Sequence, residues 1–127
     1  MFFSAVFVIE YSMKKRRRFC KNYKELAINL ADNRIKYFNS FYNFKINKVR
    51  IKNQKSRWGS CSKKRNLNFN YKIIYLKPKL ADYLIVHELC HLGELNHSRR
   101  FWALVKKTIP DYRKVNREMR STPINVI

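Results

Sequence analysis

The chain has 127 residues, of which 46% are hydrophobic, which is enough for one domain with one core and too much for an intrinsically disordered segment. Its formal net charge of +21 favours a polyanionic partner such as nucleic acid, although the basic residues are spread along the whole sequence and fit a compositional bias equally well. The cysteines, Cys20, Cys61 and Cys90, are odd in number and widely spaced. This argues against a disulfide scaffold and favours a reducing compartment, so we expect a cytoplasmic protein.

Residues 1–12 begin with a short apolar run. The run is too short to span a bilayer, and the basic residues follow it, whereas in a secretory signal peptide they come first. We therefore expect no transmembrane segment here. We interpret residues 1–12 as an N-terminal extension, either a strand or a loosely held segment, with a membrane-associating start as the alternative.

A long amphipathic helix is predicted over residues 13–42. Aromatic and aliphatic residues recur there at steps of three and four, and neither Pro nor Gly interrupts them. Arg34 is the one polar residue on the apolar face, and we expect it to extend toward solvent. The aromatic stripe is interpreted as core.

Two strands follow the helix. Within residues 43–53, Val49 and Ile51 alternate with basic residues, which is typical of a half-exposed strand. Residues 54–62 form a connection rich in small polar side chains. Residues 67–75 alternate strictly and give the clearest strand pattern in the chain. We predict that the two strands pair in an antiparallel hairpin or meander.

The C-terminal half is predicted to be helical. Pro78 opens a helix over residues 79–92 that is apolar on more than one face, so we expect it to be buried. Shorter helices are predicted over residues 99–108 and 111–120, followed by a loose tail over residues 121–127. The predicted fold class is α+β: a long N-terminal helix, a small antiparallel sheet, a buried helix and two short C-terminal helices, in one domain of residues 13–120.

All of the histidines in the chain lie between positions 87 and 97, and two belong to an HExxH pattern formed by His87, Glu88, Leu89, Cys90 and His91. On a helix His87 and His91 are one turn apart, so both imidazoles can reach one metal ion. Glu88 is the next residue round the helix and stands beside the ion. A general base must stand there to take a proton from a water that the metal activates.

His97 joins this site only if the helix ends after His91 and the chain folds back. We expect Gly93 to end the helix in a left-handed conformation, and Ser98 to cap the next helix. Three imidazoles with an open fourth position are typical of a catalytic zinc, one ion per chain.

The alternative is a structural zinc with Cys61 or Cys90 as a fourth ligand. In such a closed site Glu88 has no purpose. We instead predict that Cys90 is a small buried apolar residue on the metal helix.

Several short motifs together resemble one family. They are Arg-Trp-Gly-Ser-Cys at residues 57–61, Asn70, His-Glu-Leu-Cys-His-Leu at residues 87–92, and Asn-His-Ser with a following Phe-Trp at residues 96–102. This combination resembles the YgjP-like metal-dependent hydrolases, relatives of the SprT-type zinc metallopeptidases, from about residue 14 to residue 120. The resemblance implies a minimal zincin-like fold, with His87, His91 and His97 holding zinc and Glu88 as the catalytic base. Members of the family usually carry a further, largely β region before the long helix, where this chain has residues 1–12.

The predicted function is therefore that of a zinc metallopeptidase that cleaves peptide bonds in a peptide or protein substrate. An extended peptide would lie along an exposed strand edge. The predicted substrate-binding residues are Arg57, Trp58, Gly59, Ser60 and Asn70. Arg57 is a candidate to bind a substrate carboxylate or to stabilise the oxyanion, and the alternative for Trp58 is a packing residue that holds the hairpin against the helix.

Two other functions remain open. The charge and the kinship to SprT-type enzymes allow a nucleic-acid-associated protease, whose activity would depend on nucleic acid and fall with salt. A nucleic-acid-binding module with a structural zinc would instead use a Cys ligand and would not need Glu88. The glutamate in the motif and the lack of a paired C-x-x-C argue against this last function.

Overall fold

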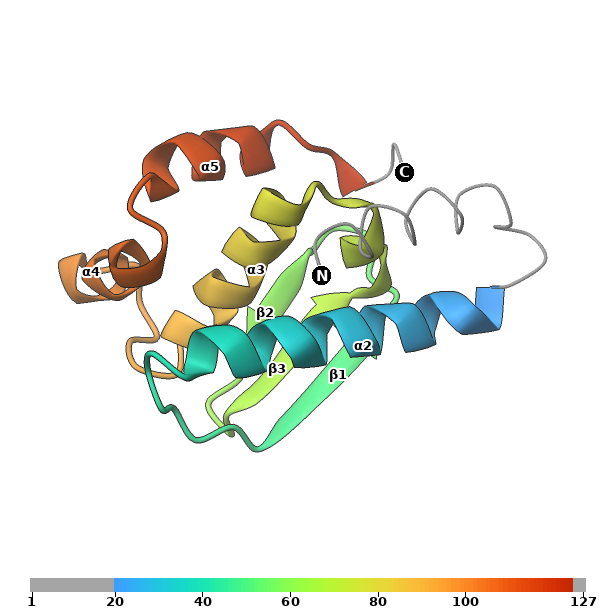
Figure 1. The fold of residues 1–127 in the computed structure, drawn as a ribbon, viewed down its shortest axis with the longest axis horizontal. Coiled ribbons are helices and arrows are strands. Elements are labelled where there is room, and N and C mark those ends of the chain that lie inside the picture. The colour runs from blue at the N-terminus through green and yellow to red at the C-terminus, as the bar shows by residue number, and fades with distance from the viewer. Residues whose placement is uncertain (1–19, 125–127) are drawn as a thin grey trace.

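The computed structural model of the chain describes residues 20–124, shown in Figure 1 as the coloured ribbon. The predicted extension of residues 1–12, the first part of the predicted long helix and the last residues of the tail lie outside this range. Within it, no helix is both long and apolar enough to cross a membrane.

The first described element is helix α2 (Cys20–Asn39), which runs along the length of the sheet in Figure 1. Its buried face carries Tyr23, Ala27, Ala31 and Phe38, and the small alanine side chains allow a close approach to the layer beneath. The aromatic stripe is core only in part, because Tyr37 is 51% exposed. The helix ends at Asn39, three residues before the predicted end. The Asn39 side chain explains this end, because its Oδ1 accepts a hydrogen bond from the backbone N–H of Phe44 and its Nδ2 donates to the carbonyl of the same residue.

The sheet has strands β1 (Lys48–Lys52), β2 (Gly59–Cys61) and β3 (Asn66–Asn70), in the order β1-β3-β2. β1 pairs with β3 in parallel and β2 pairs with β3 antiparallel. The prediction of a purely antiparallel sheet is therefore wrong: the sheet is mixed. The reason is that β3, whose Leu67 and Phe69 are fully buried, takes the centre, while the strongly basic β1 takes an edge, where exposed charge is favourable.

β3 ends at Asn70, although the alternating pattern predicted a strand as far as residue 75. Residues Tyr71–Tyr75 form the 3-10 helix η1. The Asn70 Oδ1 accepts a hydrogen bond from the Lys72 backbone N–H, and this side-chain cap turns the chain out of the strand. The alternation over residues 71–75 thus reflects a short helix with both Ile73 and Ile74 buried.

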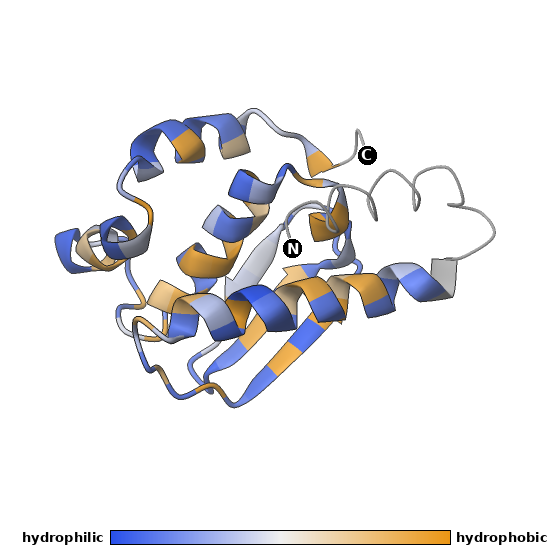
Figure 2. Cartoon of the chain, viewed as in Figure 1, coloured by the Kyte–Doolittle hydropathy of each residue, from blue (hydrophilic) through white to orange (hydrophobic). Residues whose placement is uncertain are grey.

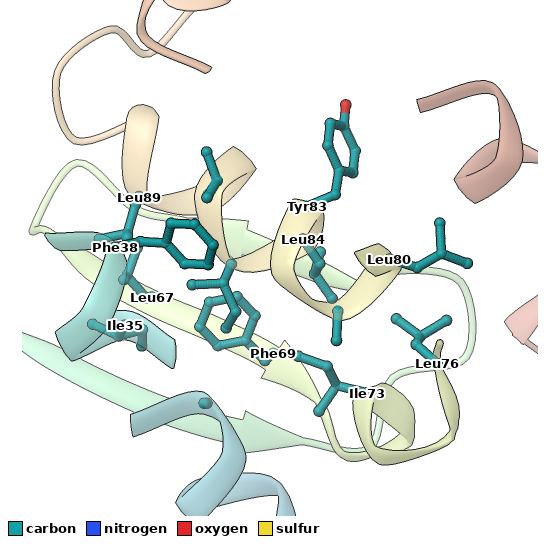
Figure 3. Packing of buried hydrophobic residues seen from close by; sticks show 14 of the residues in the cluster. Ile35, Phe38, Leu67, Phe69, Ile73, Leu76, Leu80, Tyr83, Leu84 and Leu89 are labelled. Carbon is teal, nitrogen blue, oxygen red and sulfur yellow. The ribbon is translucent and has the colours of Figure 1, made fainter. Parts of the chain in front are cut away.

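The remaining helices are α3 (Pro78–Cys90), α4 (Arg99–Thr108) and α5 (Tyr112–Arg120), close to their predicted bounds. α3 lies between α2 and α5 (Figure 1) and is the buried helix that the sequence predicts. Figure 2 shows hydrophobic and hydrophilic residues alternating along β1, as expected for a strand covered on one face. Side chains from four elements meet in one core (Figure 3), among them Phe38 of α2, Phe69 of β3, Ile73 of η1 and Leu84 of α3.

The prediction that Arg34 extends into solvent is wrong. Its Nε donates to Asp82 Oδ1 at 2.7 Å and its Nη2 donates to Asp82 Oδ2 at 3.0 Å. Both side chains are largely buried, with 14% and 16% of their surfaces exposed. The polar residue on the apolar face of α2 is therefore a bidentate clamp between α2 and α3.

Candidate metal centre

The three histidines meet at the C-terminal end of α3. The Nε2 atom of His97 lies 3.2 Å from that of His91 and 3.2 Å from that of His87. Ligand atoms of the three residues all lie within 4.8 Å of one another. The helix-and-turn arrangement that the sequence predicted is therefore the one the chain adopts.

The chain turns back after His91, which is the C-cap of α3 and still has helical backbone angles, φ −66° and ψ −17°. The prediction that Gly93 ends the helix in a left-handed conformation is wrong, because neither glycine has a positive φ. Gly93 instead allows close packing: a Cβ there would lie 2.9 Å from Cδ1 of Leu104 and 3.0 Å from the ring of Phe44, so these side chains would have to shift. Ser98 caps α4 as predicted, its Oγ accepting a hydrogen bond from the N–H of Phe101.

Hydrogen bonds fix which nitrogen of two histidines carries the proton. Nδ1 of His91 lies 3.0 Å from the carbonyl oxygen of Glu94, and since a carbonyl only accepts, Nδ1 must donate. Nδ1 of His87 lies 3.2 Å from Oε2 of Glu88 and is placed to donate to that oxygen. With the ring proton on Nδ1, the Nε2 atoms of His91 and His87 present lone pairs toward the third imidazole.

Burial also favours neutral imidazoles. It lowers the pKa of His91, and the neighbouring His87 lowers it further. Burial lowers the pKa of His97 as well, again assisted by the other two histidines. Neutral nitrogen lone pairs that converge are the donor set of a divalent metal.

The spacing fits zinc. Zinc–nitrogen bonds of about 2.0–2.1 Å in a tetrahedral centre place neighbouring nitrogens about 3.3 Å apart. The observed separations of 3.2 Å are close to this value. Among the described residues the group of potential ligands contains no cysteine, and both Cys61 and Cys90 are free thiols. Cys90 is fully buried, as predicted for an apolar packing residue, and burial raises its pKa to about 12.

An aromatic layer from α4 supports the histidine rings. The Phe101 ring stacks on His91, with 4.4 Å between centroids, and the Trp102 ring stacks on His97 at 5.8 Å. These contacts fix the orientation of two imidazoles that would otherwise rotate about their side-chain bonds. The Phe-Trp pair after His97 in the sequence thus acts by packing beneath the candidate ligands.

Glu88 is 5% exposed and lies on the same helix beside the histidines. Strand β2 passes close to it: a Cβ at Gly59 would lie 3.2 Å from Glu88 Cγ and 3.3 Å from Glu88 Oε2. The second carboxylate oxygen, Oε1, has no hydrogen-bond partner among the described residues and keeps contact with solvent. Glu88 therefore has one oxygen engaged by His87 and one available.

A cleft of about 440 Å³ opens above these groups. Four of the five predicted substrate-binding residues line it, namely Arg57, Trp58, Gly59 and Ser60. Trp58 also serves the packing role considered as its alternative, because it packs against the core and its Nε1 donates to the carbonyl of Thr122. The described start of the C-terminal tail is thus held in place, and its Ile124 is buried.

Asn70 does not line the cleft. Its side chain is fully buried, and its Nδ2 donates to the carbonyls of Gln54 and Arg57 at 2.7 Å and 3.0 Å. Together with its cap on η1, these bonds use the whole amide within the protein. Asn70 therefore shapes the loop that carries Arg57, and we do not retain it as a substrate contact.

Sequence reasoning missed the opposite wall of the cleft. Tyr83 of α3 and Asn116 of α5 line it, and the Tyr83 hydroxyl donates to Asn116 Oδ1 at 2.9 Å. Figure 3 shows this hydroxyl pointing away from the hydrophobic core. Tyr83 lies one turn before His87 and was detectable from helical spacing, whereas nothing in the sequence near Asn116 indicates that α5 folds back over the cleft.

Two solved structures resemble this fold. The metallopeptidase zymogen abylysin of Pyrococcus abyssi matches with a TM-score of 0.63 and 23% identity, over 71% of this chain and 92% of that chain. The metallopeptidase zymogen jannalysin of Methanocaldococcus jannaschii matches with a TM-score of 0.57 and 22% identity, over 73% of this chain and 92% of that one. The fold is therefore that of the small zincin-like metallopeptidases. No curated protein sequence matches the chain.

The family follows from the sequence pattern of the YgjP-like metallopeptidase domain, which matches residues 7–122. The chain belongs to the YgjP-like family and is a metal-dependent hydrolase of the metallopeptidase class. The resemblance on which the sequence analysis relied is confirmed.

Proposed function

We propose that this chain is a zinc peptidase in which His87, His91 and His97 hold one zinc ion and Glu88 is the general base. One observation carries the proposal: three Nε2 atoms converge beside a buried carboxylate in the wall of an open cleft. A bound zinc ion supplies a Lewis acid that lowers the pKa of a water molecule toward neutrality and polarises a carbonyl group.

Glu88 is suited to move the proton. Its Oε2 accepts a hydrogen bond from His87, which fixes the carboxylate, and its Oε1 is available to accept a proton from the attacking water. The same oxygen then returns the proton to the nitrogen that leaves when the peptide bond breaks.

A peptide substrate finds its backbone partners on β2, an outer strand of the sheet. The Asn70 N–H donates to the Trp58 carbonyl and the Ser62 N–H donates to the Asn66 carbonyl, so alternate residues of β2 bond to β3. The residues between them, Gly59 and Cys61, point their backbone N–H and C=O groups away from β3, into the cleft. An extended peptide that adds to this edge places its scissile bond near Glu88, because Gly59 contacts Glu88.

Asn116 is the candidate donor to the oxyanion. The Tyr83 hydroxyl engages its Oδ1, so the amide is oriented with Nδ2 on the other side. Nδ2 has no hydrogen-bond partner among the described residues, and it is not sealed from solvent. An amide N–H held in this way can stabilise the charge that develops on the scissile carbonyl oxygen.

The test is a comparison of wild type with Glu88→Gln on an unstructured protein substrate, with fragments read by mass spectrometry and zinc content by elemental analysis. Glu88→Gln keeps the shape of the side chain and removes the base, so we expect zinc to be retained and the rate to fall by about 10²–10⁴-fold. Retention of zinc together with wild-type cleavage by the variant would refute the assignment of Glu88. Loss of zinc in His91→Ala tests the ligand set independently.

A second function, a nucleic-acid-associated protease of the SprT type, is favoured by one feature of β1. Lys48, Arg50 and Lys52 are all exposed, project to the same side of the strand and form no ion pair with any described residue. Alternate residues of a strand lie about 6.6 Å apart, so the row offers three regularly spaced cations to a phosphate backbone.

This function predicts that single-stranded DNA raises the cleavage rate and that salt removes the effect. Replacing the three cations of β1 by Gln should weaken DNA binding and make it less dependent on salt. If DNA does not change the cleavage rate at low salt, the nucleic-acid-associated function is refuted and the zinc peptidase without a nucleic-acid partner is the better proposal. For the cellular context, we propose a cytoplasmic protein, since the two described cysteines are free thiols, and a catalytic domain of residues 13–120.

A further inference from the structure

A second cavity adjoins the cleft at the histidines. It has a volume of about 370 Å³, and it shares His91 and Leu95 with the first cavity, so the two meet at the candidate metal centre. Residues 57–61 line the first cavity, and Ser62, Lys63 and Arg65 continue along the wall of the second. The two cavities thus adjoin along β2 and the turn after it, and we refer to them together as the groove.

Both ends of this groove are positively charged. Arg57 stands at one end, and Lys63 and Arg65 stand at the other. None of the three forms an ion pair with a described residue. The chain as a whole is basic, but these cations differ from the rest because they line the path on which a substrate would lie.

Arg65 is held rigidly in this position. Its Nε donates to the carbonyl of Lys45 at 2.7 Å and its Nη1 donates to the carbonyl of Leu92 at 3.4 Å. Carbonyl oxygens fix the guanidinium but leave its charge uncompensated. Its backbone has φ +66°, a left-handed conformation that a turn rather than a strand requires.

The second cavity contains one acidic residue, Glu94. Its carboxylate lies 3.9 Å from the guanidinium of Arg100, a cation that does not line the cavity, so Glu94 has a cation of its own beside it. The remaining charges on the groove beyond the candidate metal centre are those of Arg57, Lys63 and Arg65. A bound peptide with acidic side chains at both ends would pair with them.

We propose that the groove selects acidic peptides, with Glu or Asp side chains on both sides of the scissile bond. The inference rests on the proposed function, since it assumes that a peptide lies along β2 with the scissile bond near Gly59. Arg57 precedes Gly59 in the chain, and Lys63 follows it in the turn after the end of β2. The favoured acidic positions therefore lie on both sides of the scissile bond, within a few residues of it.

The test uses one unstructured peptide in three versions, with Glu, Gln or Lys at the flanking positions, and the full zinc-loaded chain. We expect kcat/KM to be about two- to fivefold higher for Glu than for Gln at each matched position, the range of a partly exposed ion pair, and lowest for Lys. Lys63→Glu should remove or reverse the preference at its end. Lys64→Glu is the matched control, because Lys64 is exposed, lies next in the same turn, does not line the groove and changes the net charge by the same amount.

A second experiment measures the equilibrium binding of the same peptides to the zinc-loaded Glu88→Gln variant. Because binding does not require cleavage, this experiment tests the acidic groove independently of the proposed function. If no peptide is cut but Glu peptides bind best and Lys63→Glu reverses the order, the acidic groove stands and the peptidase proposal fails. If peptides are cut or bound without regard to their charge, or if Lys64→Glu acts like Lys63→Glu, the acidic groove is refuted whatever the rate of cleavage.

Discussion

Gly59→Ala tests whether β2 positions the general base. Gly59 has no positive φ, so the substitution causes no backbone strain, and its effect must come from the added methyl group. That Cβ would lie 3.0 Å from the Asn68 carbonyl oxygen, 3.2 Å from Glu88 Cγ and 3.3 Å from Glu88 Oε2. Ordinary carbon contacts are about 3.5–4.0 Å, so one side must give way by a few tenths of an ångström. The Asn68 oxygen belongs to the central strand, and the Glu88 side chain is therefore the part that moves.

The expected cost to catalysis follows from this displacement. A misplacement of about 1 Å costs about 10²-fold in rate, so a shift of a few tenths of an ångström should lower kcat by about tenfold. KM and zinc affinity should change much less, because the backbone edge of β2 and the three histidines stay in place. Overpacking should lower the free energy of unfolding by about 1 kcal/mol.

The assay is steady-state cleavage of a fluorogenic peptide, with zinc content and thermal unfolding measured on the same samples. Ile73→Val is the control, since Ile73 is fully buried away from the cleft and its truncation costs a similar amount, about 1 kcal/mol. It should leave kcat unchanged. A Gly59→Ala enzyme with wild-type kcat, or one whose loss is explained by lower zinc content, would refute the reasoning.

Four further predictions concern the metal, the clamp between α2 and α3, and the loop that carries Arg57. Removing zinc with a chelator should lower the stability measured by thermal unfolding by about 2.7 kcal/mol relative to free zinc at 100 times its Kd, and an unchanged transition would speak against a bound ion. Burial raises the pKa of Asp82 in the folded protein despite the neighbouring Arg34. The contribution of Asp82 to stability is therefore full below the pKa of the unfolded state and is lost as the pH rises through the pKa of the folded state. Asp82→Asn should flatten this part of the pH–stability profile, and a profile identical to that of the wild type would contradict the direction of the shift. Arg34→Met and Asp82→Asn should each lower the free energy of unfolding in urea by about 3 kcal/mol, because each leaves one member of a buried pair without its partner, and a negligible loss in either variant would count against the clamp. Asn70→Ala should raise KM more than it lowers kcat, since it frees the loop that carries Arg57, and a selective loss of kcat would instead place Asn70 in the chemistry.

The sequence predicted which three histidines converge at the end of α3, because the parts of this candidate site are local. His87 and His91 are joined by one helical turn, and Ser98 marks the start of the next helix, so short-range rules suffice to bring His97 back. The chemistry of three imidazoles and one carboxylate then restricts what the site can do. The helices were predicted for the same reason, since each buries an apolar face that repeats along its own length.

The sheet was predicted less well because its pairing is decided over long separations. The period of β1 is the same whether it runs parallel or antiparallel to its neighbour, so alternation alone does not give the direction. Alternation over residues 67–75 also hid the end of β3, where a single capping side chain, that of Asn70, turns the chain into η1. Arg34 was misjudged because its partner Asp82 lies on another helix, and nothing in the spacing along α2 indicates it.

Strand β2 was not predicted from the sequence, and its role is visible only in the structure. It has only three residues, Gly59–Cys61, and no periodicity that would predict a strand. Yet its outer edge turns backbone N–H and C=O groups away from β3, and its Gly59 lies against Glu88. The glycine of the Arg-Trp-Gly-Ser-Cys motif is thus explained by a residue of the HExxH helix: only a residue without a side chain lets the substrate edge and the general base lie in contact. The two motifs lie in contact, and in the function we propose α3 would hold the metal and the base while β2 would place the bond to be broken beside them.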